Sequence, residues 1–182
     1  MRIHRAIATL AWCGASLLGG LAQAQTPARG ATTAAPRPQV SATLAQLMKG
    51  ILFPSSNVIF AAQGDNPADV KPAADPSTAT NPLAGTYGKW EAVENSALAI
   101  VEAANLLTIP GRKCSNGLNV PLQNADWAKF VQGIREAGMT AYKAAQSKNQ
   151  DNILMASDAL ATACANCHDK YREKPNLADR CK

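Results

Sequence analysis

The sequence predicts an all-α fold, an antiparallel four-helix bundle with a long loop between its first two helices. Two observations lead to this prediction. Apolar residues recur with a period near 3.6 in four separate stretches, each long enough to form a helix that buries one face. No stretch shows the strict apolar–polar alternation of a half-exposed strand. Four amphipathic helices in a chain of one-domain length bury their apolar faces by packing together as a bundle.

The first helix is expected to begin at Ser41, whose hydroxyl can cap its N-terminus. The apolar residues on one face of this helix are Leu44, Leu47, Met48, Ile51 and Leu52. Pro54 interrupts the pattern, and a further helical stretch is expected from Ser55 to Phe60. Residues 63–86 then form a polar, proline-rich connection of unusual length, which we expect to cross from one end of the bundle to the other.

The other three helices are expected over about residues 86–108, from 123 to 147, and from Gln150 or Asp151 onward. Pro110-Gly111 ends the first of these helices and Pro175 ends the last. Each contributes an apolar stripe at helical spacing, so each can pack one face against the others.

The N-terminus, residues 1–24, has the features of a secretory signal peptide. Arg2 and Arg5 give it a positive start, residues 6–21 are apolar, and residues 22–24 fit an A-x-A cleavage site. The alternative is a membrane anchor, but the strongly apolar part falls short of the ~20 residues needed to span a bilayer. We therefore expect export to the periplasm, with no stable membrane insertion after cleavage.

Residues 25–40 are rich in Ala, Pro, Thr and Gln and are expected to be a disordered leader, which leaves residues 41–182 for the bundle. The net charge of the whole chain is +5, and cleavage of the signal peptide removes two arginines. No cluster of Lys and Arg appears in the sequence. The charge pattern therefore argues against nucleic acid as a partner.

The residues that carry chemistry are Cys164-Ala165-Asn166-Cys167-His168, close to the C-terminus. Two thiols and an imidazole at this spacing are typical of a covalent attachment site for c-type haem. On a helix the three side chains project from one face, because they stand at i, i+3 and i+4. Cys164 and Cys167 can then hold the porphyrin edge through thioether bonds while His168 binds the iron. One covalent haem c is the expected cofactor.

Zinc and a thioredoxin-like pair are the alternatives for this motif. Zinc needs four ligands, and cleavage leaves His168 as the sole histidine. Cys114 and Cys181 could complete a four-cysteine set, but His168 would then have no role. A thioredoxin-like pair lies at the start of a helix after a strand, whereas Cys164 and Cys167 lie near the end of a long helix. In an oxidising compartment we expect a disulfide between Cys114 and Cys181, the alternative being two free thiols.

The stretch from Ala163 to Arg172 resembles the C-terminal signature of class II cytochromes c, which include cytochrome c′ and its methionine-ligated, low-spin relatives. The family combines a signal peptide, four antiparallel helices and a haem motif near the C-terminus. The resemblance implies a periplasmic electron carrier, not an enzyme, with redox proteins as partners. Members often form homodimers through their first two helices. The length of the 63–86 loop, the Cys114/Cys181 pair and the tail after Pro175 depart from the family pattern.

The sixth iron ligand is a methionine or is absent, because a second histidine is lacking. Met155 shares the helix of His168 and is badly placed for the opposite haem face, whereas Met139 on the third helix remains a candidate. The resemblance implies Met48, in a Leu-Met-Lys setting on the first helix, as the distal ligand. The alternatives are that Met48 only fills a gap in the core, or that the distal site is open and binds NO or CO as in cytochrome c′. Leu44 and Leu47 would line that open site together with Met48.

Arg172 stands one helical turn after His168. The resemblance implies that it belongs to the haem environment, where a cation disfavours ferric iron. The alternative is a solvated charge that interacts with the helix dipole. A peroxidase is disfavoured, since no second histidine can serve as a distal acid or base.

Overall fold

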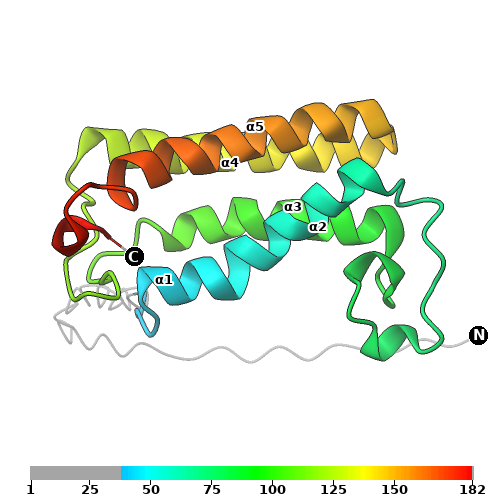
Figure 1. The fold of residues 1–182 in the computed structure, drawn as a ribbon, viewed down its shortest axis with the longest axis horizontal. Coiled ribbons are helices and arrows are strands. Elements are labelled where there is room, and N and C mark those ends of the chain that lie inside the picture. The colour runs from blue at the N-terminus through cyan, green and yellow to red at the C-terminus, as the bar shows by residue number, and fades with distance from the viewer. Residues whose placement is uncertain (1–37, 182) are drawn as a thin grey trace, which may run out of the picture. The chain divides into compact units, whose positions relative to one another are not determined.

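Four antiparallel helices form the fold, as predicted, in the computed structural model, which describes residues 38–181 (Figure 1). The helical elements are α1 (Leu44–Leu47), the π-helical turn η1 (Met48–Leu52), α2 (Phe53–Gly64), α3 (Lys89–Leu106), α4 (Ala125–Ser147) and α5 (Gln150–Tyr171). The elements α1, η1 and α2 follow one another directly and together form the first helix of the bundle. The expected signal peptide and the expected leader up to residue 37 lie outside the described residues.

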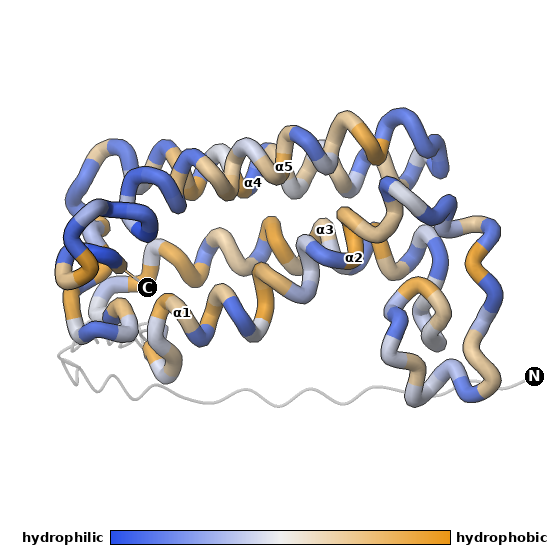
Figure 2. The backbone as a smooth tube through the Cα atoms, viewed as in Figure 1, coloured by the Kyte–Doolittle hydropathy of each residue, from blue (hydrophilic) through white to orange (hydrophobic). Residues whose placement is uncertain are grey.

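Each helix of the bundle packs against two others. Helix α3 lies between α2 and α4, and α5 lies between α4 and α2, so the four helices enclose one core. Figure 2 shows that each helix carries hydrophobic positions interspersed with hydrophilic ones. The most deeply buried side chains of this core include Ile59, Val93, Ile100, Trp127, Ile153 and Leu160. No helix among residues 38–181 is long and apolar enough to cross a membrane.

Alanine occupies many core positions, and one glycine shows how close the helices come. A Cβ atom at Gly138 of α4 would lie 2.8 Å from the Val101 Cγ2 atom and 3.3 Å from the Ala97 carbonyl oxygen of α3. Small residues therefore bring the α3 and α4 backbones together, and larger side chains at this crossing would separate them.

The long connection between α2 and α3 does not cross the bundle, contrary to the sequence-based expectation. It leaves α2 and enters α3 at the same end, because these two helices are antiparallel neighbours (Figure 1). Within this loop are two short 3₁₀ turns, η2 (Pro76–Thr78) and η3 (Pro82–Ala84). Leu83 in η3 is 1% exposed and anchors the loop to the core. Helix α3 begins at Lys89, later than expected, after the extended Gly88.

The start of the first helix also differs from the expectation. Its N-cap is Thr43 and not Ser41. The Thr43 hydroxyl accepts a hydrogen bond from the Gln46 N–H at 3.2 Å, and the Gln46 side chain accepts one from the Thr43 N–H at 2.9 Å. This reciprocal capping box satisfies two backbone donors that a helix start leaves without partners.

Pro54 changes the type of helix without ending it. The proline ring leaves no N–H at residue 54, and in a regular α-helix it would press on the carbonyl of Gly50. The backbone instead widens into η1 just before Pro54, and α2 starts with the proline in its first turn, where no N–H is needed. One continuous helical path therefore runs from Leu44 to Gly64.

Candidate functional site

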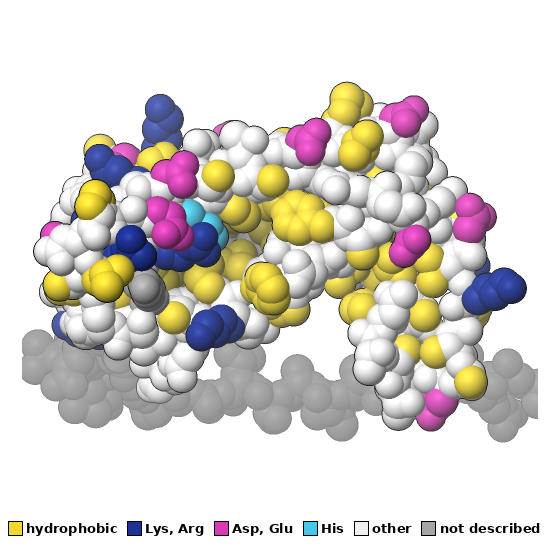
Figure 3. Space-filling view, in the orientation of Figure 1, with side chains coloured by type: hydrophobic (Ala, Val, Ile, Leu, Met, Phe, Trp, Pro, Cys, Tyr) yellow, Lys and Arg dark blue, Asp and Glu magenta, His cyan; other side chains and the backbone are white. Residues whose placement is uncertain are grey.

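A pocket at one end of the bundle brings together residues from the first helix, α4 and α5 with Leu107, which directly follows α3. Its lining consists of Met48, Leu107, Trp127, Phe130, Val131, Ile134, Cys164, Cys167 and His168. Figure 3 shows a hollow on this face that is lined by hydrophobic side chains, with a histidine at its rim. Apart from the imidazole and the indole N–H, every side chain in this lining is apolar or carries sulfur. We call this site the four-donor pocket, after Met48, Cys164, Cys167 and His168.

Helix α5 supplies three of the four donors. Cys164, Cys167 and His168 are all half-buried and line the pocket, so the helical face predicted from their spacing does turn toward it. The helix ends directly after them, where the His168 carbonyl accepts hydrogen bonds from the N–H groups of Arg172 and Glu173 at 2.7 and 2.9 Å. The three donors thus lie in the last two turns of a rigid helix.

Met48 approaches the same pocket from the first helix and is the first residue of η1. Of the three methionines in the described region, Met48 lines the pocket and the other two do not. Met139 is half-buried on α4 away from the lining, and Met155 on α5 is 65% exposed. Leu44 and Leu47, which would line an open distal site, are instead buried in the core and do not line the pocket.

Burial sets the protonation of the three α5 donors. It raises the pKa of the Cys164 thiol, and burial together with the neighbouring Cys164 raises the pKa of Cys167 to about 11. Burial, helped by the positive charge of Arg172, lowers the pKa of His168. At neutral pH the sulfurs are therefore thiols and the imidazole is neutral. Reactive redox dithiols need a lowered thiol pKa, so these values argue against a thioredoxin-like pair.

One stripe of α4 forms the wall of the pocket. Trp127, Phe130, Val131 and Ile134 stand at i, i+3, i+4 and i+7, a spacing that puts them on one face of the helix. The sequence indicates Trp127 as an aromatic of the core or of the haem packing, whereas it does not indicate that Phe130, Val131 and Ile134 line the site, because periodicity does not show what a helix face contacts. The Trp127 indole N–H donates to the Leu107 carbonyl at 3.1 Å, which fixes the ring in place.

Tyr171 supports this wall from the end of α5. Its ring packs edge-on against Trp127, with ring centroids 5.2 Å apart, and also contacts the Phe130 ring. The Tyr171 hydroxyl donates to the Asp126 carboxylate and accepts a hydrogen bond from the Asn124 amide. The hydrogen bond from Tyr171 lowers the pKa of Asp126. The pKa of Tyr171 is raised, mainly by burial and secondly by the hydrogen bond to Asp126.

Arg172 is exposed and does not line the pocket. Its Nε atom lies 2.5 Å from the Glu173 Oε1 atom, so it forms an ion pair with the next residue. Its influence on the site is electrostatic: its positive charge is the second cause, after burial, of the lowered pKa of His168.

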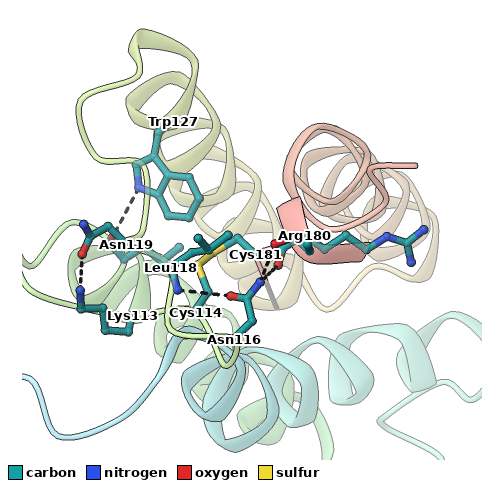
Figure 4. Close-up of a disulfide and its surroundings, with 10 residues drawn as sticks. Lys113, Cys114, Asn116, Leu118, Asn119, Trp127, Arg180 and Cys181 are labelled. Atoms are coloured by element: carbon teal, nitrogen blue, oxygen red, sulfur yellow. Dashed lines mark hydrogen bonds between the residues drawn. A yellow bond between two sulfur atoms is a disulfide. The ribbon is translucent and has the colours of Figure 1, made fainter. Parts of the chain in front are cut away.

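A disulfide joins Cys114 to Cys181 and ties the C-terminal tail to the loop between α3 and α4 (Figure 4). The two Cα atoms are 5.0 Å apart, and both cysteines are buried. The Asn116 amide reinforces the link by donating to the carbonyls of Ala178 and Arg180 at 3.1 and 2.8 Å. The tail that follows His168 is thereby held against the bundle.

The donor set of the pocket matches the requirements of haem c. Two thiols can form thioethers, a neutral imidazole can bind iron, and a thioether from the facing helix can bind the other side. Zinc is a poorer match, since Cys114 and Cys181 are bonded to each other and cannot complete a four-ligand set. The free space in the pocket is about 30 Å³, so the surrounding side chains would have to move to accommodate a porphyrin.

No family model, curated protein or solved structure matches this chain.

Proposed function

We propose that this protein is a periplasmic c-type cytochrome of the class II kind, which carries single electrons on one covalently bound haem. Cys164 and Cys167 would attach the group through thioether bonds, and the His168 imidazole and the Met48 thioether would bind its iron. The observation that carries the proposal is the four-donor pocket itself. It unites a methionine and a Cys-x-x-Cys-His motif that are more than a hundred residues apart in the sequence.

Each side chain has a distinct part in this proposal. The neutral imidazole of His168 offers a lone pair to iron at physiological pH. The apolar wall of α4 keeps water away from the metal, which favours a stable one-electron couple. As a ligand, the Met48 thioether would raise the reduction potential and favour electron transfer over binding of small gases. The haem supplies the redox chemistry when bound.

The partners that follow from this proposal are other redox proteins, and no catalytic residue is assigned. We also propose that the protein is exported to the periplasm and belongs to the class II cytochrome c family. The buried Cys114–Cys181 disulfide supports an oxidising compartment, because structural disulfides persist there and are rare where thiols are kept reduced.

Absorption spectra of the purified protein, oxidised and reduced, test the assignment of the ligands. His168/Met48 ligation predicts low-spin iron in both states, the weak red band of thioether-bound ferric iron, and no reaction with CO. High-spin ferrous iron that binds CO readily would contradict the role of Met48. It would instead indicate a five-coordinate, gas-binding protein of the cytochrome c′ kind.

A further inference from the structure

Asp126 lies in the first turn of α4, directly before Trp127, which lines the four-donor pocket. The Tyr171 hydroxyl, at the end of α5, donates a hydrogen bond to one carboxylate oxygen of Asp126. The Lys170 ammonium lies 3.7 Å from the other carboxylate oxygen. Both contacts cross from the helix that carries the Cys-x-x-Cys-His motif to the helix that forms the pocket wall. Asp126 thus joins these two sides of the site through polar contacts.

The carboxyl group of Asp126 is ionised at neutral pH. The hydrogen bond from Tyr171 is the main reason that its pKa lies below the usual value, and the positive charge of Lys170 helps, against a smaller opposing effect of burial. The position in the first turn also favours the ionised form, because a helix N-terminus stabilises negative charge. The Asn124 amide donates to the Tyr171 hydroxyl at 3.2 Å, which orients the hydroxyl proton toward Asp126. The carboxylate is therefore a fixed negative charge.

This negative charge reaches the donors on α5. It contributes to the raised pKa of Cys167, after burial and the neighbouring cysteine. The Asp126 side chain is 35% exposed, so water screens its field only in part. The Lys170 side chain is 57% exposed and neutralises only part of that field. Arg172 and Glu173, which follow on the same segment, pair with each other and largely cancel.

We propose that Asp126 lowers the reduction potential of the bound haem by holding one fixed negative charge at the wall of the four-donor pocket. The inference rests on the proposed function. Ferric haem carries one more positive charge than ferrous haem, so a nearby carboxylate stabilises the ferric state and a nearby ammonium, that of Lys170, disfavours it. Tyr171 positions the carboxylate, because its hydroxyl holds Asp126 while its ring packs against Trp127 and Phe130.

Potentiometric titration of the haem-loaded protein at about 0.1 M ionic strength tests this inference with two neutralising variants. Asp126→Asn keeps an acceptor for the Tyr171 hydroxyl but removes the charge, and should shift the ferric/ferrous ratio at a fixed potential roughly two- to fivefold toward ferrous iron. Lys170→Gln should shift the ratio toward ferric iron, and by less, because Lys170 is more exposed. Asp126→Glu retains the charge and should stay closer to the wild type. A general loosening of the pocket would move both neutralising variants the same way, so opposite shifts identify the effect of charge.

Two matched variants control for the loss of a charge elsewhere. Asp151→Asn removes a carboxylate from the first turn of α5, about 20 Å along the helix from Cys164, and Lys143→Gln removes an exposed ammonium from α4. Neither should change the ratio, because exposed charges beyond a Debye length of about 10 Å are largely screened. An unchanged ratio in Asp126→Asn, or shifts of Asp126→Asn and Lys170→Gln in the same direction, overturns the inference and leaves the proposed function standing. A protein that carries no haem overturns both.

Discussion

The backbone N–H of Phe53 donates to the carbonyl of Met48, five residues earlier, and Pro54 follows immediately. This bond defines the π-helical turn η1, and Met48 is the residue at its start. Single π turns often occur at functional sites, because an extra residue in the turn redirects the side chains before it. The proline and the methionine that lines the four-donor pocket are thus parts of one local structure.

Replacing Pro54 with alanine is expected to redirect Met48. The variant restores an N–H at residue 54 and removes the steric reason for η1, so the helix can close into a regular α-helix. The loss of one inserted residue rotates Met48 by about 100° relative to α2. We predict the loss of the red thioether–iron band and new binding of CO, with unchanged helix content by circular dichroism. An unchanged spectrum would show that Pro54 does not position Met48.

Removal of the Met48 side chain tests the ligand itself. Met48→Ala should open one face of the iron, allow CO to bind and lower the reduction potential, because the thioether that favours ferrous iron is gone. Met155→Ala is the matched control, since Met155 is 65% exposed and does not line the pocket. Spectroscopic titration with CO measures both. Equal CO binding by the two variants would exclude Met48 as the ligand.

Two glycines of α4 should respond in opposite ways to alanine. The Cβ atom added at Gly138 meets the stiff side chain of Val101 at 2.8 Å, so Gly138→Ala should lower the free energy of unfolding by about 1–3 kcal/mol. At Gly133 nothing lies within 4 Å, and the helix should gain about 0.5–1 kcal/mol from the better helix former. Urea unfolding measures both, and equal effects would contradict the close α3–α4 packing.

The Cys114–Cys181 bond is expected to be a major source of stability. The two cysteines are 67 residues apart, and closing a loop of this size contributes about 4 kcal/mol through the unfolded state. The double variant Cys114→Ala/Cys181→Ala should lose about that much in urea unfolding. Mass spectrometry of unreduced peptides gives the direct check. Alkylation of both thiols in the unreduced protein would refute the bond.

Local periodicity predicted the helices and the position of the long loop. It also predicted the face of α5 that carries Cys164, Cys167 and His168. The Cys-x-x-Cys-His motif is also local, since its three side chains share a face whatever lies opposite. The sequence predicts an interruption at Pro54, because a proline inside a helical pattern usually breaks it. The structure shows that the helix continues past Pro54, because the π-helical turn η1 accommodates the proline ring.

Tertiary contacts explain what the sequence could not show. The role of Phe130 and Ile134 as a pocket wall depends on which helix faces α4. The path of the long loop depends on α2 and α3 being neighbours. The cap at Thr43 is instead a local feature that the sequence does carry, because Gln46 stands three residues later, as a capping box requires. Only the family resemblance predicts Met48 in the site, since periodicity alone indicates a core residue.

The intact mass of the mature protein, exported from a host with working haem-attachment machinery, tests the central claim most directly. The account predicts a coloured protein heavier than its polypeptide by one haem. Cys164→Ala and Cys167→Ala should each reduce attachment, while the Cys114–Cys181 bond remains. A colourless product with the mass of the bare polypeptide would contradict the account.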